Sequence, residues 1–184
     1  MKQYLKYVLY GLAFLSLSVS CAKGGTEIPS TNIPVNSARA LYEGIAIDAE
    51  GNEYEKYQVI LTLGESLGYE MKTAGAIIVL ELNTEHGTGG GRIPCELAYQ
   101  PIKEGKPLTY TFTEGSGNSP ALGNGSFLGI KDSEFDPVEF TPIKNGLIFI
   151  ENETGEYSFE GIIDTGEQAF TFNFAGVMPF TEKN

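Results

Sequence analysis

Residues 146–175 read GLIFIENETGEYSFEGIIDTGEQAFTFNFA, and this stretch decides the fold class. Its three apolar-rich segments are separated by two short runs of turn-forming residues, 152–155 (NETG) and 164–167 (DTGE). Asn, Asp and Gly at such positions favour hairpin turns. Phe170, Phe172 and Phe174 alternate with polar residues, which is the two-residue period of a strand with one buried face. The stretch therefore predicts three strands near 146–151, 156–163 and 168–175, joined as a meander.

The rest of the chain continues this pattern toward the N-terminus. A strand is expected over 39–47 with a turn at 48–52, and alternating strands are expected over 57–63 and 108–112. Residues 76–82 (AIIVLEL) are apolar almost throughout, which indicates a central strand covered on both faces. No helical period is sustained. The prediction is an all-β, two-layer antiparallel β-sandwich of about nine or ten strands, with a β-barrel of similar strand number as the alternative.

The first twenty residues have the composition of an export signal. Lys2 and Lys6 precede the apolar run 7–15 (YVLYGLAFL), and small residues follow it. The run is shorter than the roughly 20 apolar residues of a membrane-spanning helix. The segment Ser18-Val19-Ser20-Cys21 resembles the lipobox of bacterial lipoproteins, with Ser18 where that family usually has an aliphatic residue. The resemblance implies that Cys21 is lipidated and becomes the first residue of the mature protein.

Three segments follow from this assignment. Residues 1–20 are predicted to be the signal peptide, 21–36 a flexible tether and 37–184 the β-sandwich domain. Lipidation at Cys21 would anchor the chain to a membrane. Ala22 follows in place of the aspartate that retains some lipoproteins at the inner membrane, so the resemblance implies the outer membrane. The periplasmic and cell-surface faces remain alternatives.

A second resemblance lies in the folded part. The order of an apolar strand 146–150, a G-x-Y-x-apolar-x-G segment at 155–161 and an aromatic strand ending at Gly176 is similar to the end of many small Bacteroidetes lipoproteins. Residues 40–44 are similar to their first strand. That family is largely of unknown function, and where a role is suspected it involves glycan capture or cell-surface assembly. The resemblance defines no functional residue.

The charge balance narrows the choice of partners. The chain has 24 acidic and 12 basic residues, for a net charge of −12. Nucleic acids and anionic lipids require clustered Lys and Arg, so the composition argues against nucleic acid as a partner. The acidic surface itself favours solubility outside the cytoplasm.

The sequence offers few groups with catalytic or metal-binding potential. Cys95 is the second cysteine and His86 the single histidine, and too few such ligands exist for a zinc site. A buried structural role is expected for Cys95 and an exposed loop position for His86. No catalytic or metal-binding residue is assigned, and no cofactor is expected beyond structural calcium. The acidic turns 48–52 and 132–136 are the candidates for calcium.

Two loops and four tyrosines are the candidates for ligand binding. The glycine-rich loops 86–91 and 115–125 are the places where a ligand is expected, because loops on a rigid sheet often carry binding function. In the absence of tryptophan, the aromatic rings available to a sugar are those of Tyr42, Tyr54, Tyr69 and Tyr99. The alternative is that these rings pack in the core or across strands.

Three functional hypotheses result. The first is a non-enzymatic, lipid-anchored binding or accessory protein for a glycan or a protein. The second is a structural or assembly component of the cell envelope or fimbriae, which would present an edge strand for β-augmentation. The third, of lowest weight, is a hydrolase that uses a pair of acidic residues.

The anchor can be tested with the two cysteines of the chain. When the chain is expressed in a bacterium fed with labelled palmitate, the wild type is expected to take up label and to fractionate with membranes. Cys21→Ala should abolish both properties, because the thiol is the acceptor, whereas the matched variant Cys95→Ala should retain both. Equal labelling of the two variants would refute lipidation at Cys21.

Overall fold

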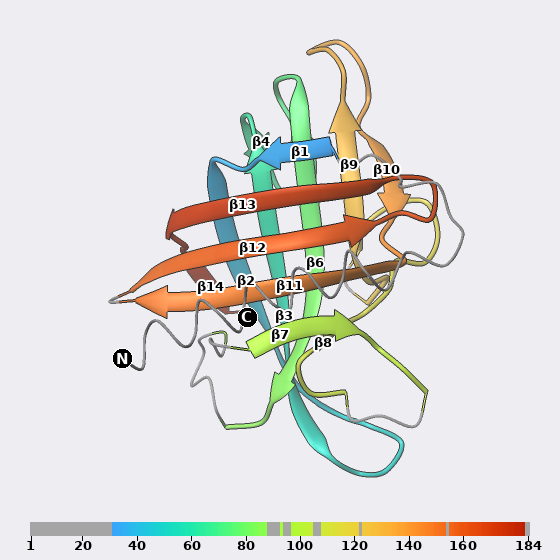
Figure 1. Cartoon of the computed structure of the whole chain (residues 1–184), viewed down its shortest axis with the longest axis vertical. Helices are drawn as coiled ribbons and strands as arrows, with labels where there is room; N and C mark the ends of the chain where they lie inside the picture. The colour runs from blue at the N-terminus through green and yellow to red at the C-terminus, as the bar shows by residue number, and fades with distance from the viewer. Residues whose placement is uncertain are drawn as a thin grey trace, which may run out of the picture.

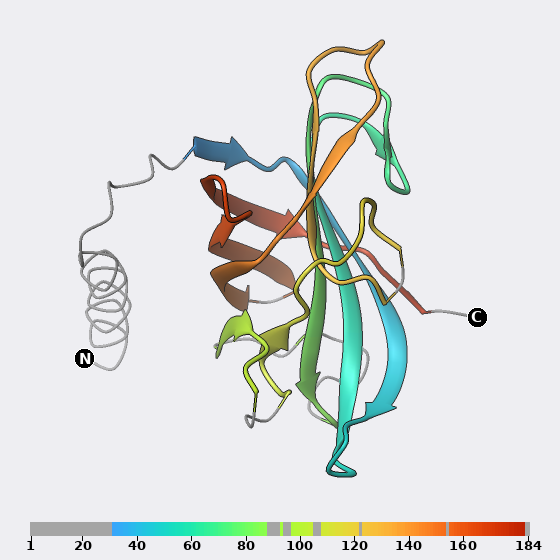
Figure 2. The ribbon, with the colours of Figure 1, turned by 90° about the vertical axis from the view of Figure 1, so that its right-hand side faces the viewer.

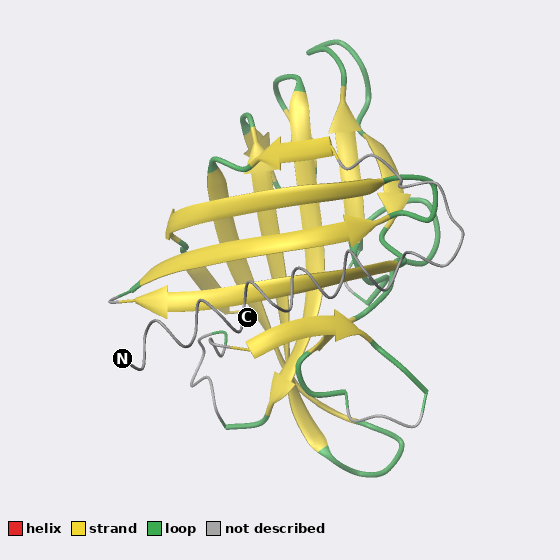
Figure 3. Cartoon of the chain, in the orientation of Figure 1, coloured by secondary structure: helices red, strands yellow, loops and turns green. Residues whose placement is uncertain are grey.

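The computed structural model describes residues 31–87, 93, 97–104, 108–121, 123–153 and 155–182. Within these residues the chain forms fourteen strands and no helix (Figures 1 and 3), which confirms the all-β prediction. The strands are β1 (Thr31–Pro34), β2 (Ser37–Ile47), β3 (Glu53–Leu63), β4 (Ser66–Leu67), β5 (Glu70–Met71), β6 (Gly75–Glu85), β7 (Leu97–Pro101), β8 (Thr111–Phe112), β9 (Phe127–Lys131), β10 (Glu139–Pro142), β11 (Asn145–Glu153), β12 (Glu156–Asp164), β13 (Ala169–Val177) and β14 (Phe180–Glu182).

The strands form two layers that cross one another (Figure 1). The first layer contains β1, β13, β12, β11 and β7, and the second contains β14, β2, β3, β6, β9 and β10, with β8 beside β6. The predicted meander is confirmed: β11 pairs with β12 and β12 with β13, both antiparallel, within two residues of the expected bounds. β11 ends at Glu153 and β12 begins at Glu156, and the second turn lies at 165–168.

The two layers are joined at both sides. On one side, β1 and β2 follow one another as one bent strand, and β13 and β14 as another. The two bent strands run parallel: β1 (Thr31–Pro34) pairs with Phe170–Asn173, and Ala40–Tyr42 pairs with β14 (Phe180–Glu182). The backbone N–H of Ala40 donates to the carbonyl of Pro179 at 2.9 Å in the bend. On the other side β7 pairs with β11 in the first layer and with β8 in the second. The result is one large sheet curled around its own core.

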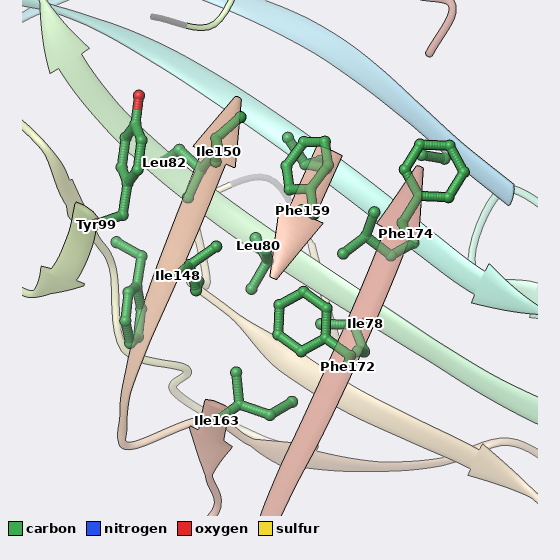
Figure 4. Packing of buried hydrophobic residues seen from close by; sticks show 14 of the residues in the cluster. Ile78, Leu80, Leu82, Tyr99, Ile148, Ile150, Phe159, Ile163, Phe172 and Phe174 are labelled. Carbon is green, nitrogen blue, oxygen red and sulfur yellow. The ribbon is translucent and has the colours of Figure 1, made fainter. Parts of the chain in front are cut away.

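The core fills the space between the layers. Ile78, Leu80 and Leu82 of β6 point toward Phe159, Phe172 and Phe174 of the first layer (Figure 4), and all six are at most 7% exposed. Phe172 and Phe174 follow the two-residue period that the sequence predicts, Ile78, Leu80 and Leu82 have the same spacing, and Phe159 comes from the neighbouring strand β12. A second cluster lies on the outer face of the second layer, where Ile77 and Val79 pack with residues from other segments, namely Ile60, Met71, Tyr69, Val138 and Phe140. The prediction that 76–82 is covered on both faces is therefore confirmed.

Several details of the prediction require correction. The sheet is mixed rather than antiparallel, because the β1–β13, β14–β2 and β7–β8 pairings are parallel. Strands outnumber the predicted nine or ten mainly through short pieces such as β4, β5 and β8, which have two residues each. The alternation over 108–112 does not form a full strand. Tyr110 has φ of +58°, in the left-handed region, so the extended backbone begins only at Thr111.

The folded part also begins earlier than the predicted boundary at residue 37. Residues 31–34, within the predicted tether, form β1, and Ile33 is 5% exposed in the core. The short link at 35–36 then turns the chain from the first layer into β2. Residues 1–30, which include the predicted signal peptide and Cys21, lie outside the described residues.

The joining role of β1 can be tested by truncating its buried side chain. Ile33→Ala is expected to lower the free energy of unfolding by about 2–5 kcal/mol, the usual effect of Ile→Ala in a core. Urea denaturation of the full chain measures the change. The control Val177→Ala, at a residue that is 70% exposed, should stay within about 0.5 kcal/mol of the wild type. A similar small effect of Ile33→Ala would contradict the assignment of β1 to the fold.

Candidate functional site

The outer face of the second layer carries a buried carboxylate beside its apolar cluster. Glu81 of β6 is 1% exposed, and it continues the outward-facing row of Ile77 and Val79. One oxygen, Oε1, lies 2.7 Å from Nζ of Lys56 on the neighbouring strand β3. The other, Oε2, accepts hydrogen bonds from the backbone N–H groups of Gly123 at 3.1 Å and Gly125 at 3.3 Å. Both carboxylate oxygens therefore have partners, and these interactions stabilise the fold.

Glu81 fixes both ends of the loop that connects β8 to β9. Its carbonyl accepts from the N–H of Thr113 at 2.9 Å, and its own N–H donates to Oγ of Ser126 at 3.0 Å. The N–H of Ser126 in turn donates to the carbonyl of Thr113 at 2.9 Å. Gly125 has φ of +88°, and a Cβ there would lie 2.0 Å from the Glu114 carbonyl oxygen, so glycine is required. These hydrogen bonds therefore fix both ends of the loop to the sheet.

Lys56 is held in its charged form by a close pairing with this carboxylate. Burial alone would lower the pKa of Lys56, but the hydrogen bond and charge of Glu81, with a further contribution from Glu43, outweigh burial and raise the pKa. The Glu43 carboxylate lies 3.8 Å from the same Nζ. Lys56 and its two acids thus form a compact charge network across β2, β3 and β6.

A hairpin made by β4 and β5 folds back over the same face. The N–H of Lys72 donates to the carbonyl of Glu65 at 2.8 Å, and Oγ1 of Thr73 accepts from the N–H of Glu65 at 3.1 Å. Tyr69 reaches down to the sheet, where its hydroxyl donates to Oε1 of Gln58 at 2.6 Å. Burial raises the pKa of Tyr69 above the ordinary range of tyrosine. These contacts hold residues 64–73 above β3.

A groove lies where the hairpin, the β8–β9 loop and the β9–β10 segment approach one another. Figure 2 shows the hairpin and the loop projecting from the same side of the second layer. The groove has a volume of about 690 Å³, within the usual range of ligand pockets. We name it the Tyr69 groove. It is lined by Leu67, Tyr69, Glu70, Met71, Ser119, Pro120, Lys131, Pro137, Val138 and Phe140.

Exposed hydrophobic and acidic residues line the Tyr69 groove or are close in sequence to residues that line it. Leu67, at the hairpin tip, is 67% exposed, and Phe135, in the β9–β10 connection two residues from Pro137, is 88% exposed. The same connection carries the exposed acids Asp132, Glu134 and Asp136. Large apolar side chains exposed at the rim of an apolar groove are typical of interaction sites.

Some of the ligand-binding candidates proposed from the sequence line the Tyr69 groove, and others do not. Within the 115–125 loop, Ser119 and Pro120 line the Tyr69 groove, and Tyr69 lines it as well. Tyr42 and Tyr99 pack inside: the rings of Tyr42 and Tyr57 lie 5.2 Å apart, and Tyr99 is fully buried. Tyr54 is half-buried on β3 and does not line the groove. The alternative of core and cross-strand packing is thus correct for two of the four tyrosines.

His86, the first residue of the glycine-rich loop 86–91, lies beside two carboxylates. Its Nε2 is 3.4 Å from Oε2 of Glu53, and its Nδ1 is 3.8 Å from Oε1 of Glu55. The buried Glu55 carboxylate also accepts from the hydroxyl of Tyr57 at 2.8 Å and from the N–H of Gly87 at 3.1 Å. Burial and the Glu55 carboxylate raise the pKa of Tyr57 far above its usual value. Cys95 and residues 88–91 lie outside the described residues.

The acidic turns proposed for calcium hold local hydrogen bonds. In the first, the Asp48 carboxylate accepts from the side chain of Asn52 at 2.9 Å and from the N–H groups of Asn52 at 2.7 Å and Glu50 at 3.0 Å, which lowers its pKa. In the second, the Ser133 hydroxyl donates to Asp136 at 2.6 Å. Among the described residues no group of three or more His, Cys, Asp or Glu converges as metal ligands. Structural calcium therefore stays a prediction.

Sequence reasoning did not identify the hairpin 64–73 or Phe140 as parts of the site. The available signal was the pair Gly64 and Gly68, two turn-forming residues four positions apart. That signal marks a turn but does not say that the turn folds back over the sheet.

Comparison with protein-family models, with curated proteins and with solved structures finds no match to this chain. In the part of the chain that the structure describes, no helix is long and apolar enough to cross a membrane.

The anchoring role of Glu81 gives a testable prediction. Glu81→Gln keeps the shape but removes the charge and turns an acceptor into a donor facing Lys56 or the glycine N–H groups. The free energy of unfolding should fall by about 1–3 kcal/mol, the effect of leaving buried polar groups unpaired. Backbone amides at 123–126 should also exchange hydrogen faster. The exposed variant Glu151→Gln is the control, and a Glu81→Gln protein with wild-type stability and exchange would contradict the anchoring role.

Proposed function

We propose that this chain is a non-enzymatic, lipid-anchored binding protein outside the cytoplasm, and that the Tyr69 groove holds a segment of a polypeptide partner. The observation that carries the proposal is the groove itself, which is lined by three segments: the β4–β5 hairpin, the β8–β9 loop, and residues of β9, β10 and their connection. Hydrogen bonds from Tyr69 to Gln58 and from Gly123 to Glu81 hold the hairpin and the loop to the sheet, so the groove is preformed and little ordering free energy opposes binding.

The lining favours a polypeptide over a glycan. Seven of its ten residues are apolar or aromatic, including Leu67, Met71 and Val138, and these complement apolar side chains better than sugar hydroxyls. The lining holds one acid, Glu70, and one base, Lys131, whose Nζ already donates to the carbonyl of Met71, whereas the neighbouring β9–β10 connection is acidic and the chain as a whole carries −12. The partner that fits is therefore an extended segment with apolar side chains flanked by Lys or Arg.

The other two hypotheses have weaker support. Hydrolysis by paired acids requires two carboxylates across a cleft, whereas Glu70 is the one carboxylate in this lining. Assembly by β-augmentation requires an accessible edge strand of useful length. The strands at the ends of the described sheet are short, since β1 and β10 have four residues each and β14 has three. Short edges are a common protection against such pairing.

A peptide microarray can test the polypeptide assignment. The labelled full chain, kept in detergent, is applied to linear peptides that share an apolar core and differ in flanking charge. Peptides flanked by Lys or Arg are expected to bind best, with a salt-dependent gain over acidic versions.

The matched variants are Leu67→Ser at the rim and Val177→Ser on the first layer, both at residues at least 67% exposed. Leu67→Ser should weaken peptide binding about tenfold, equal to about 1.4 kcal/mol, because an apolar contact is lost. Val177→Ser should change nothing. Equal affinities for both variants, or binding to a parallel glycan array in place of the peptides, would overturn the assignment.

A further inference from the structure

A second groove lies on the other side of the β4–β5 hairpin, and its chemistry differs from that of the Tyr69 groove. It has a volume of about 360 Å³, and its polar lining consists of Ser37, Arg39, Thr62, Glu65, Ser66 and Lys72. We name it the cationic groove. The side chains come from β2, β3 and the hairpin, so the site exists only after the hairpin has folded back.

The cationic groove has more basic than acidic residues, whereas the whole chain is negatively charged. The sequence has twice as many acidic as basic residues, yet the groove presents two cations and one acid, Glu65. Among the described residues no carboxylate oxygen forms a salt bridge with Arg39 or Lys72. Lys56, on the same face, is neutralised by Glu81 and Glu43. The two cations of the groove thus keep their charge available for a ligand.

Arg39 is also held in position by the hairpin. Its Nη2 donates to the backbone carbonyl of Gly68, which fixes one edge of the planar guanidinium and leaves the other N–H groups for further bonds. Gly68 itself has φ of +62° at the hairpin tip. A cation positioned by the backbone loses less rotamer entropy on binding than a free side chain.

From these observations we propose that the cationic groove binds an acidic saccharide unit, a sugar ring that carries a carboxylate or a sulfate. Arg39 and Lys72 provide charge-assisted hydrogen bonds to the anionic group. The hydroxyls of Ser37, Thr62 and Ser66 donate to and accept from the ring hydroxyls. Ile60 is the single large apolar residue of the lining, so an apolar peptide side chain finds little to contact. The volume is at the small end of ligand pockets, which suits one or two sugar rings.

This site is independent of the polypeptide site in the Tyr69 groove. The two grooves share the hairpin as a common wall but have no lining residue in common. A change at Lys72 or at Leu67 therefore alters the lining of one groove alone.

Isothermal titration of the full chain in detergent tests the proposal with four probes. These are an oligogalacturonate of four residues, a sulfated oligosaccharide of the same length, neutral maltotetraose and a tetraglutamate peptide. Saturable binding is expected for the first or the second probe and not for maltotetraose or tetraglutamate. Affinity should fall as salt is raised, because the attraction is partly ionic. The two acidic arms distinguish a carboxylate from a sulfate as the recognised group.

Two matched variants locate the binding. Lys72→Gln should weaken acidic-saccharide binding at least fivefold, and Lys103→Gln, at another exposed lysine away from the groove, should not. Arg39→Gln should abolish binding, with urea denaturation confirming that the variant folds. Leu67→Ser should leave it unchanged, which separates this site from the polypeptide site. No saturation by either acidic saccharide, equal loss in Lys72→Gln and Lys103→Gln, or tighter binding of tetraglutamate would overturn the proposal.

Discussion

The burial of β6 on both faces is the constraint from which the rest of the surface architecture follows. From Ala76 to Thr84 every residue of this strand is buried. The inner side chains are covered by the first layer, but Ile77, Val79 and Glu81 on the outer side need separate cover. No third layer exists among the described residues, so the β4–β5 hairpin, the β8–β9 loop and the β9–β10 segment provide that cover. Because these pieces leave the sheet from different strands, the Tyr69 groove remains between them, and the cationic groove remains between the hairpin and the strands β2 and β3.

The covering pieces are held by polar groups that the sheet itself supplies. Glu81 binds the glycine N–H groups of the β8–β9 loop, and Gln58 accepts the hydroxyl of Tyr69 from the hairpin. Each of these hydrogen bonds is at least partly buried. Burial strengthens a hydrogen bond, and it makes an unpaired polar group cost free energy. The grooves are therefore bordered by segments with defined positions, and their lining combines residues of strands with residues of loops. This arrangement combines loop chemistry with the rigidity of a sheet.

The two grooves complement each other in charge and polarity. The Tyr69 groove is lined mainly by apolar and aromatic residues, whereas the cationic groove is lined by hydroxyls and two cations. A chain that is lipid-anchored at Cys21, as its leader suggests, would present both grooves at the end of a tether. A binding protein with one polypeptide site and one acidic-saccharide site would link two components of a cell envelope. That reading unites the glycan and protein alternatives left open by the sequence.

The sequence by itself determined where the main strands lie and which of their faces are buried. Alternation at Phe170, Phe172 and Phe174 and the apolar run 76–82 are local signals, because side chains on a strand alternate regardless of what the strand pairs with. The tertiary structure decided the parallel pairing of β1 with β13, the return of the hairpin over β3 and the partnership of Glu81 with Gly125, which lies 44 residues away. A periodic pattern states that a face must be covered but not which segment covers it. The grooves arise from that choice, so only the folded chain could place them.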